Sequence, residues 1–199
     1  MCWKKWVSSF LVTLVLQAAL TTMVRAHELS TQELTGHGGD FTLQSFDGPV
    51  SLEQLRGKVV LIFFGYTSCP DVCPTTLASL SNVFSNLEVQ ELERVVALFI
   101  TLDPKRDTPY LMKKYTGYFH ANIIGVTGDK RVIDQITENY GVTYERKKKT
   151  SSSLGYIINH TVDILVINQE GQLMDRRIRP LTSTDEILVY LRKLLSSGL

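Results

Sequence analysis

The sequence is poor in cysteine, in proline and in net charge. Its 199 residues include three cysteines, which are too few for a fold stapled by disulfides. The 21 lysines and arginines balance 20 aspartates and glutamates, so the formal net charge is +1. No global field therefore attracts nucleic acid, and nucleic acid is not expected as a partner. None of the six prolines falls between Tyr110 and Arg179.

The composition fits one globular domain with an ordinary core, since 44% of the residues are hydrophobic and 21% are charged. Two near-continuous apolar runs, residues 59–67 and 94–103, predict buried central strands. Apolar residues then recur at helical spacing at Leu77, Leu80 and Phe84. Strands that alternate with helices predict an α/β sheet with helices on both faces.

Further elements are expected along the rest of the chain. A short hairpin is predicted near residues 40–48, and a polar loop around residues 145–153. The pattern predicts helices over residues 108–119, 129–141 and 182–195, a strand at 122–128, and a hairpin over 155–178 that turns at 168–172.

The first 26 residues resemble a secretory leader. Lys4 and Lys5 precede a mostly apolar stretch that ends near Ala26. The stretch is almost long enough to span a bilayer, so residues 1–26 are interpreted as a signal peptide or an N-terminal membrane anchor. In either case residues 27–199 are exported. For a bacterial chain this predicts a periplasmic protein, or one anchored to the inner membrane and facing the periplasm.

Cys69 and Cys73 lie four residues apart in the stretch FFGYTSCPDVCP, directly after the first apolar run. Thiols at the start of a helix ionise more readily than free cysteine. Their spacing permits a disulfide when oxidised and a grip on a soft metal when reduced. Two buried structural thiols are a third interpretation, although Asp71, between Pro70 and Pro74, indicates a surface segment.

The stretch DFTLQSFDGPVSLEQLRGKVVLIFFGYTSCPDVCPTTL resembles the Sco/SenC family of copper chaperones, with its CPxxCP signature. The similarity continues through TLDPKRDTP, YGV and YIINHT and covers residues 38–195. The resemblance implies a thioredoxin-like α/β fold over residues 27–199, with a central mixed sheet flanked by helices and an N-terminal hairpin extension.

The resemblance also implies a metal site made of Cys69, Cys73 and His160. Two thiolates and an imidazole suit Cu(I), can also hold Cu(II), and leave a position open for transfer. Zinc accepts the same donors, so the residues alone do not separate the two metals. His160 lies between a polar segment and the apolar run TVDILVI, and ligands gather at the ends of such strands.

Other polar residues near the predicted site have weaker claims. Asn159 precedes His160 where many family members carry aspartate, so Asp163 is a candidate substitute that would orient the ligand. Asp71 could tune the thiolates or meet a partner. His27 could chelate copper only if cleavage after Ala26 makes it the N-terminus.

The segment DPKRDTP invites a catalytic interpretation, but a structural one is favoured. Asp107 or Thr108 can cap the following helix, and Arg106 can pair with a carboxylate to shape the loop beside the site. The basic run of residues 146–149 is interpreted first as a solvated loop and second as a docking patch.

The family resemblance implies a copper metallochaperone that supplies the copper-A centre of cytochrome c oxidase. Its implied partners are the oxidase subunit that carries this centre, a copper donor chaperone and a thioredoxin-like reductant. The alternative is a thiol-disulfide oxidoreductase that uses Cys69 and Cys73 to reduce the cysteines of that centre. A general thioredoxin role is disfavoured, because such enzymes place a cis-proline opposite their cysteines and no proline lies in the region of His160. A peroxidase would need an activating arginine that the sequence does not place.

Overall fold

The computed structural model describes residues 37–148, 155–175, 177–180 and 182–197. The expected leader and His27 lie outside the described residues, as do residues 149–153 of the expected polar loop. Within the described ranges, no helix combines the length and the apolar character needed to cross a membrane.

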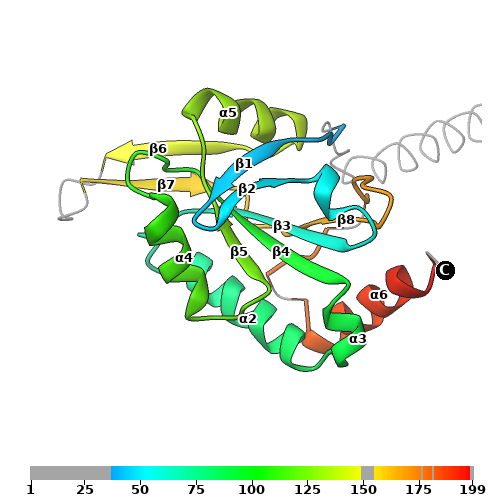
Figure 1. The fold of residues 1–199 in the computed structure, drawn as a ribbon. Helices are drawn as coiled ribbons and strands as arrows, with labels where there is room; N and C mark the ends of the chain where they lie inside the picture. The colour runs from blue at the N-terminus through cyan, green and yellow to red at the C-terminus, as the bar shows by residue number, and fades with distance from the viewer. Residues whose placement is uncertain (1–36, 149–154, 176, 181, 198–199) are drawn as a thin grey trace, which may run out of the picture. The chain divides into compact units, whose positions relative to one another are not determined.

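The centre of the fold is a four-stranded sheet with the order β5–β4–β3–β8 (Figure 1). Strands β3 (Val59–Gly65), β4 (Val95–Thr101) and β5 (Ile123–Val126) run parallel, and β8 (Leu165–Ile167) is antiparallel to β3. Every residue of β3 and β4 is buried. The sheet is mixed and its two long strands are central, so the expected fold class is confirmed.

Both faces of the sheet are covered, and residues of β3 alternate between them. Leu61 and Phe63 pack into one core beside helices α2 (Val72–Ser85), α4 (Pro109–Gly117) and α6 (Thr184–Ser196). Ile62 and Phe64 pack into the other core, which includes residues of helix α5 (Lys130–Asn139) and strand β1 (Thr42–Ser45). Short helices η1 (Glu53–Leu55) and α3 (Val89–Leu92) complete the connections.

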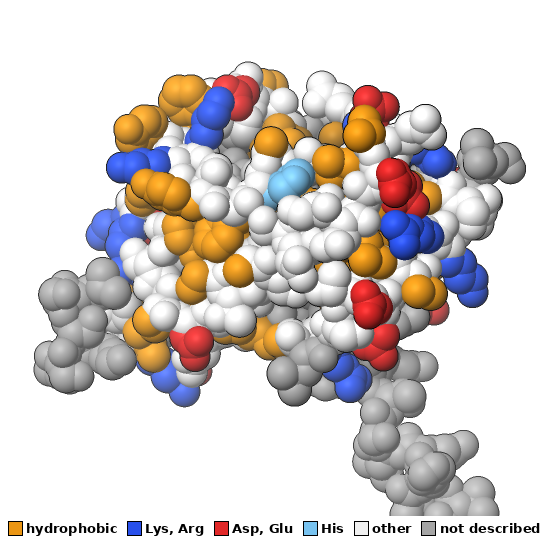
Figure 2. All heavy atoms as spheres, turned by 90° about the horizontal axis from the view of Figure 1, so that it is seen from below, with side chains coloured by type: hydrophobic (Ala, Val, Ile, Leu, Met, Phe, Trp, Pro, Cys, Tyr) orange, Lys and Arg blue, Asp and Glu red, His pale blue; other side chains and the backbone are white. Residues whose placement is uncertain are grey.

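The expected N-terminal hairpin is present, since β1 pairs antiparallel with β2 (Gly48–Ser51). The expected helix starts are also present. The hydroxyl of Thr108 caps α4 by accepting a hydrogen bond from the N–H of Leu111. The surface that is seen from below the view of Figure 1 carries basic, acidic and hydrophobic side chains side by side (Figure 2).

The predicted hairpin over residues 155–178 forms around its turn, but its first residues pair elsewhere. Strand β7 (Tyr156–His160) pairs instead with β6 (Tyr144–Lys148), which occupies part of the expected polar loop, and β8 joins the central sheet. Four of the five residues of β6 are exposed, so this strand has no apolar alternation for a pattern to detect. The expected turn does form, where the N–H of Asn168 donates to the carbonyl of Gln172. The returning segment pairs back through isolated bridges from Leu173 to Ile167 and from Ile178 to Ile164.

Candidate metal centre

Three separate elements bring Cys69, Cys73 and His160 together. Cys69 lies in the loop after β3, Cys73 lies in the first turn of α2, and His160 ends β7. Their sulfur and ring-nitrogen atoms all lie within 4.8 Å of one another, and Cys73 Sγ is 3.6 Å from His160 Nε2. It is the only group of at least three potential metal-binding cysteine, histidine and acidic side chains in the described part of the chain. A segment 87 residues from Cys73 along the chain thus completes the cluster.

The last residue of β3, Gly65, makes room for the buried sulfur. A Cβ atom at this position would lie 2.7 Å from Cys73 Sγ and 2.6 Å from Cε2 of Phe99. Both distances are far shorter than ordinary contact, so only glycine lets the helix place its sulfur against this strand end. The sequence analysis did not single out Gly65, although a glycine at the end of an apolar strand is a signal of close approach.

A backbone carbonyl orients the imidazole of His160. Its Nδ1 lies 2.7 Å from the carbonyl oxygen of Thr161. Because a carbonyl can only accept, Nδ1 carries the hydrogen and Nε2 presents its lone pair on the side of Cys73. The rings of Phe63 and Tyr66 stand edge-on to the imidazole, with centroids 6.2 Å and 6.1 Å away. The histidine is therefore oriented to bind a metal through the lone pair of Nε2.

The two sulfurs have opposite electrostatic environments. A hydrogen bond from Cys73 lowers the pKa of Cys69 to about 4, and the backbone N–H groups of Asp71 and Cys73 add to the effect. The same hydrogen bond to Cys69, together with burial, raises the pKa of Cys73. The reduced pair therefore carries a thiolate on Cys69 and a thiol on Cys73, and a metal held by both sulfurs displaces that last proton.

Exposure also differs between the two cysteines. Cys73 is completely buried, whereas Cys69 is half-buried and His160 is partly exposed. Cys69 and Cys73 are not joined in a disulfide. The donors therefore form a soft site with a dry inner side and an accessible outer side, which fits Cu(I) and is compatible with zinc.

The sequence matches a family model described as SCO1/SenC over residues 30–196. The chain belongs to the SCO1/SenC family.

Relatives of this SCO1/SenC protein include the SCO2-like protein RP587 of Rickettsia prowazekii, which is 37% identical over 69% of the chain and 67% of the relative. Among solved structures, Bradyrhizobium japonicum ScoI with copper bound is 34% identical, with a TM-score of 0.73 over 80% of this chain and 100% of that one. A third solved structure is that of BsSco, a member of the Sco family of cytochrome c oxidase assembly proteins in which a disulfide switch was identified. It is 24% identical, with a TM-score of 0.63 over 83% of this chain and 96% of that one. BsSco supports the fold alone.

The structure corrects the role expected of Asp163 in this SCO1/SenC protein. Its carboxylate pairs with Arg177 at 3.7 Å, while the carbonyl of Thr161 takes the Nδ1 hydrogen of His160. Asp71 is exposed and acts on Cys69 through its backbone N–H rather than its carboxylate. A backbone carbonyl leaves no trace in the sequence, so residue types could not reveal this orienting contact.

Tyr66 is a further residue that the sequence analysis missed. Its hydroxyl accepts a hydrogen bond from the N–H of Ile158, at 3.3 Å, and so ties the end of β3 to β7. Burial first, and then the charge of Cys69, raise the pKa of this phenol. Tyr66 therefore touches the strand that carries the histidine and lies within the field of the cysteine pair.

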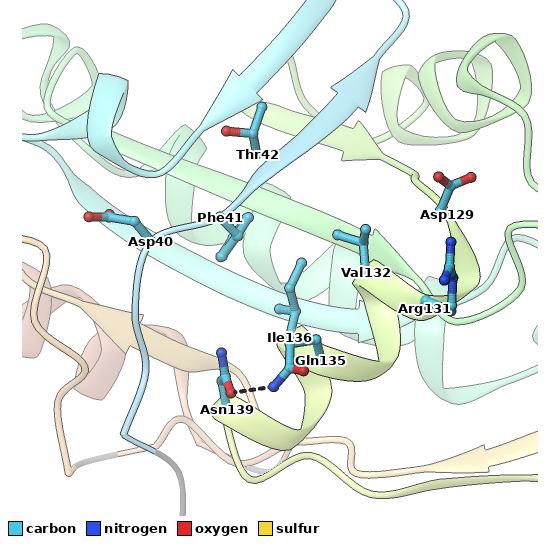
Figure 3. A pocket seen from close by; sticks show the side chains of 9 residues that line it. All are labelled: Asp40, Phe41, Thr42, Asp129, Arg131, Val132, Gln135, Ile136 and Asn139. Carbon is cyan, nitrogen blue, oxygen red and sulfur yellow. Dashed lines mark hydrogen bonds between the residues drawn. The ribbon is translucent and has the colours of Figure 1, made fainter.

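A separate hollow of about 380 Å³ lies between β1 and α5 (Figure 3). Phe41, Val132 and Ile136 form its apolar part, and Gln135 donates to Asn139 at its rim, at 3.0 Å. None of the three clustered donors lines it. This hollow is not part of the candidate metal centre.

Proposed function

We propose that this protein is a copper metallochaperone that binds one copper ion through Cys69, Cys73 and His160 and delivers it to the copper-A centre of cytochrome c oxidase. The observation that carries the proposal is the convergence of two sulfurs and one imidazole nitrogen within 4.8 Å. This donor set suits Cu(I) and leaves a coordination position open for a recipient ligand. The copper-bound structure of Bradyrhizobium japonicum ScoI supports the choice of metal.

Copper is the cargo of the proposed reaction. Cys69 is already a thiolate, Cys73 gives up its proton on binding, and His160 presents the Nε2 lone pair fixed by Thr161. The aromatic rings of Phe63 and Tyr66 stand edge-on to the imidazole. Two soft sulfur donors favour the reduced ion over Cu(II).

The recipient and the compartment belong to the same proposal. Sco family proteins are linked to cytochrome c oxidase assembly. The recipient is then the oxidase subunit that carries the copper-A site, a copper donor chaperone loads the protein, and a thioredoxin-like reductant keeps the cysteines reduced. Residues 1–26 act as a signal peptide or anchor, and the domain works in the periplasm or on the inner membrane facing it.

Competition with a Cu(I) chelator tests the site. The reduced protein is titrated beside His160→Ala, with His120→Ala as a matched control because His120 lies outside the donor cluster. We expect binding at one copper per chain and an affinity at least about tenfold weaker in His160→Ala only, which corresponds to about 1.4 kcal/mol. Equal affinity of the wild type and His160→Ala contradicts the three-donor site.

Delivery is tested in cells. Cys69→Ser and Cys73→Ser variants are expected to abolish copper binding and to lower the copper-A content of the assembled oxidase. If copper binding is lost while oxidase assembly continues at the wild-type level under limiting copper, the delivery role fails although the binding role stands.

A thiol-disulfide oxidoreductase that reduces the cysteines of the copper-A site is the second candidate, and the lowered pKa of Cys69 favours it. The Cys69 thiolate attacks one sulfur of the target disulfide, whose other sulfur leaves as a thiolate. Cys73 then loses its proton and attacks Cys69, which breaks the mixed disulfide and releases the second target sulfur as a thiolate. The target has then gained two electrons, and Cys69 and Cys73 have become a disulfide. Absence of exchange between the reduced protein and an oxidised copper-A peptide excludes this activity.

A further inference from the structure

Two fully buried carboxylates contact the two segments that carry the clustered cysteines and histidine. Asp103 and Asp107 follow strand β4 in the segment DPKRDTP, and neither side chain is exposed to solvent. Buried carboxylates require hydrogen-bonding partners, and the partners of these two point to different elements.

Asp107 holds the loop that carries the cysteines. Its Oδ2 accepts a hydrogen bond from the backbone N–H of Thr67 at 3.0 Å, and its Oδ1 accepts one from the Thr67 hydroxyl at 2.6 Å. Thr67 lies two residues before Cys69. The carboxylate of Asp107 therefore fixes where the chain leaves β3 and enters the cysteine loop.

Asp103 holds the hairpin that carries the histidine. Its two carboxylate oxygens accept from the hydroxyl of Tyr156 at 3.0 Å and 2.9 Å, and Oδ1 accepts from the guanidinium of Arg146 at 3.2 Å. Tyr156 and Arg146 lie on the paired strands β7 and β6, and His160 ends the same β7. Arg106 also pairs with Asp103, and its guanidinium lies 3.9 Å from the centre of the Tyr156 ring.

The two carboxylates are joined through one short turn. The hydroxyl of Thr101 donates to Asp107 at 2.6 Å and accepts from the N–H of Asp103 at 2.9 Å. The carbonyl of Asp103 accepts from the N–H of Asp107 at 2.9 Å. One turn therefore carries both carboxylates, and each of them makes its further contacts with a different element.

The hairpin needs such a tie because it is not part of the central sheet. Strands β6 and β7 pair with each other and with no other named strand of the described chain. Backbone ladders therefore do not set the position of His160 relative to the cysteines. Side-chain contacts hold the hairpin in place: Asp103 accepts from Tyr156, the Tyr66 hydroxyl accepts from the N–H of Ile158, and the Tyr144 hydroxyl donates to Asp134 of α5.

We propose that Asp103 and Asp107 are positioning residues that together set the gap between His160 and the cysteine pair. Asp103 acts through the hairpin and therefore only through the histidine, whereas Asp107 acts through the cysteine loop. Neither carboxylate touches the metal. The part of this inference that concerns copper rests on the proposed function, and the part that concerns the position of the hairpin does not.

A double-mutant cycle tests the copper part. Asp103→Asn is made in the wild type and in His160→Ala, and Cu(I) affinity is measured by chelator competition. We expect about tenfold weaker binding in the wild-type background and no change in the His160→Ala background. Asp107→Asn is expected to weaken binding in both backgrounds. An equal loss from Asp103→Asn in both backgrounds overturns the assignment of this residue to the histidine.

Amide hydrogen exchange of the metal-free protein gives a second readout that needs no copper. Asp103→Asn is expected to speed exchange at least about tenfold in β6 and β7 and to leave residues 66–73 unchanged, whereas Asp107→Asn is expected to do the reverse. Tyr156→Phe and Arg146→Met each remove a tie to Asp103, from a half-buried and an exposed position respectively, so they replace Asp103→Asn if that variant does not fold. Lys147→Met is the matched control, because Lys147 pairs with Glu145 on the same strand.

The outcomes separate the two proposals. Unchanged exchange in the hairpin of the Asp103 and Tyr156 variants overturns the positioning role. If the hairpin loosens as expected while the wild-type protein binds no copper, the positioning role stands and the proposed function fails.

Discussion

Gly65→Ala is expected to disturb the metal centre by crowding one sulfur. The added methyl group would lie 2.7 Å from Cys73 Sγ and 2.6 Å from the Phe99 ring, and both side chains are fully buried. The sulfur would need to retreat by about 0.7 Å to restore ordinary contact. Overpacking of this kind costs about 1–3 kcal/mol of folding stability.

Two measurements follow from that displacement. The melting temperature of Gly65→Ala is expected to fall by about 2–4 °C for each kcal/mol lost, as measured by calorimetry on the metal-free protein. Its Cu(I) affinity is expected to fall at least about tenfold, or about 1.4 kcal/mol, because the sulfur no longer faces His160 Nε2 at its present distance of 3.6 Å.

Gly125→Ala is the matched control. Gly125 lies in β5, and a Cβ atom there would meet the backbone and Cβ of Met112 at 2.9 Å, so the crowding is similar but involves no donor of the site. It is expected to lose stability and to keep its copper affinity. If both variants lose copper affinity equally, or if Gly65→Ala loses none, the reasoning about the sulfur is refuted.

Three further predictions concern single groups. Alkylation of Cys69 in the metal-free folded protein is expected to stay fast from pH 8 to about pH 5 and to slow only as the pH falls toward the pKa of about 4, because the fold stabilises the thiolate. In urea-unfolded protein the alkylation rate is expected to fall as soon as the pH drops below about 8.5. If the folded and unfolded proteins show the same dependence of rate on pH, the lowered pKa of Cys69 is contradicted. Tyr115→Phe is expected to leave stability equal or up to about 1 kcal/mol higher in urea titrations, since the buried Tyr115 hydroxyl has no hydrogen-bond partner among the described residues; a clear loss would reveal a partner. Ser183→Ala is expected to cost about 0.5–2 kcal/mol without changing copper affinity, because Ser183 caps α6 by accepting from the N–H of Glu186 at 3.3 Å.

The sequence predicted those parts of the fold that depend on local pattern. The long apolar runs became β3 and β4, and Thr108 caps the helix that it was expected to start. Strand β6 could not be predicted from the hydrophobic pattern, because its residues Glu145 to Lys148 are all exposed. Its pairing with β7 depends on tertiary context rather than on periodicity. The sequence pattern also predicts one strand before the turn, where the structure has the separate strands β7 and β8.

The site was predictable where it depends on residue types and not where it depends on proximity. Cys69, Cys73 and His160 carry recognisable chemistry, and the fold brings them together. Gly65 matters because a sulfur from the next helix approaches it, and the carbonyl of Thr161 matters because a ring nitrogen faces it. Such contacts become visible only when distant segments are placed in space.

The unequal exposure of the two sulfurs gives any encounter with another thiol a fixed sequence of events. The sulfur of another molecule can approach Cys69, which is half-buried, but not Cys73, which is completely buried. In disulfide exchange the joined intermediate therefore forms on Cys69, and Cys73 is the sulfur that ends it. The order of steps is built into the depth at which each cysteine lies.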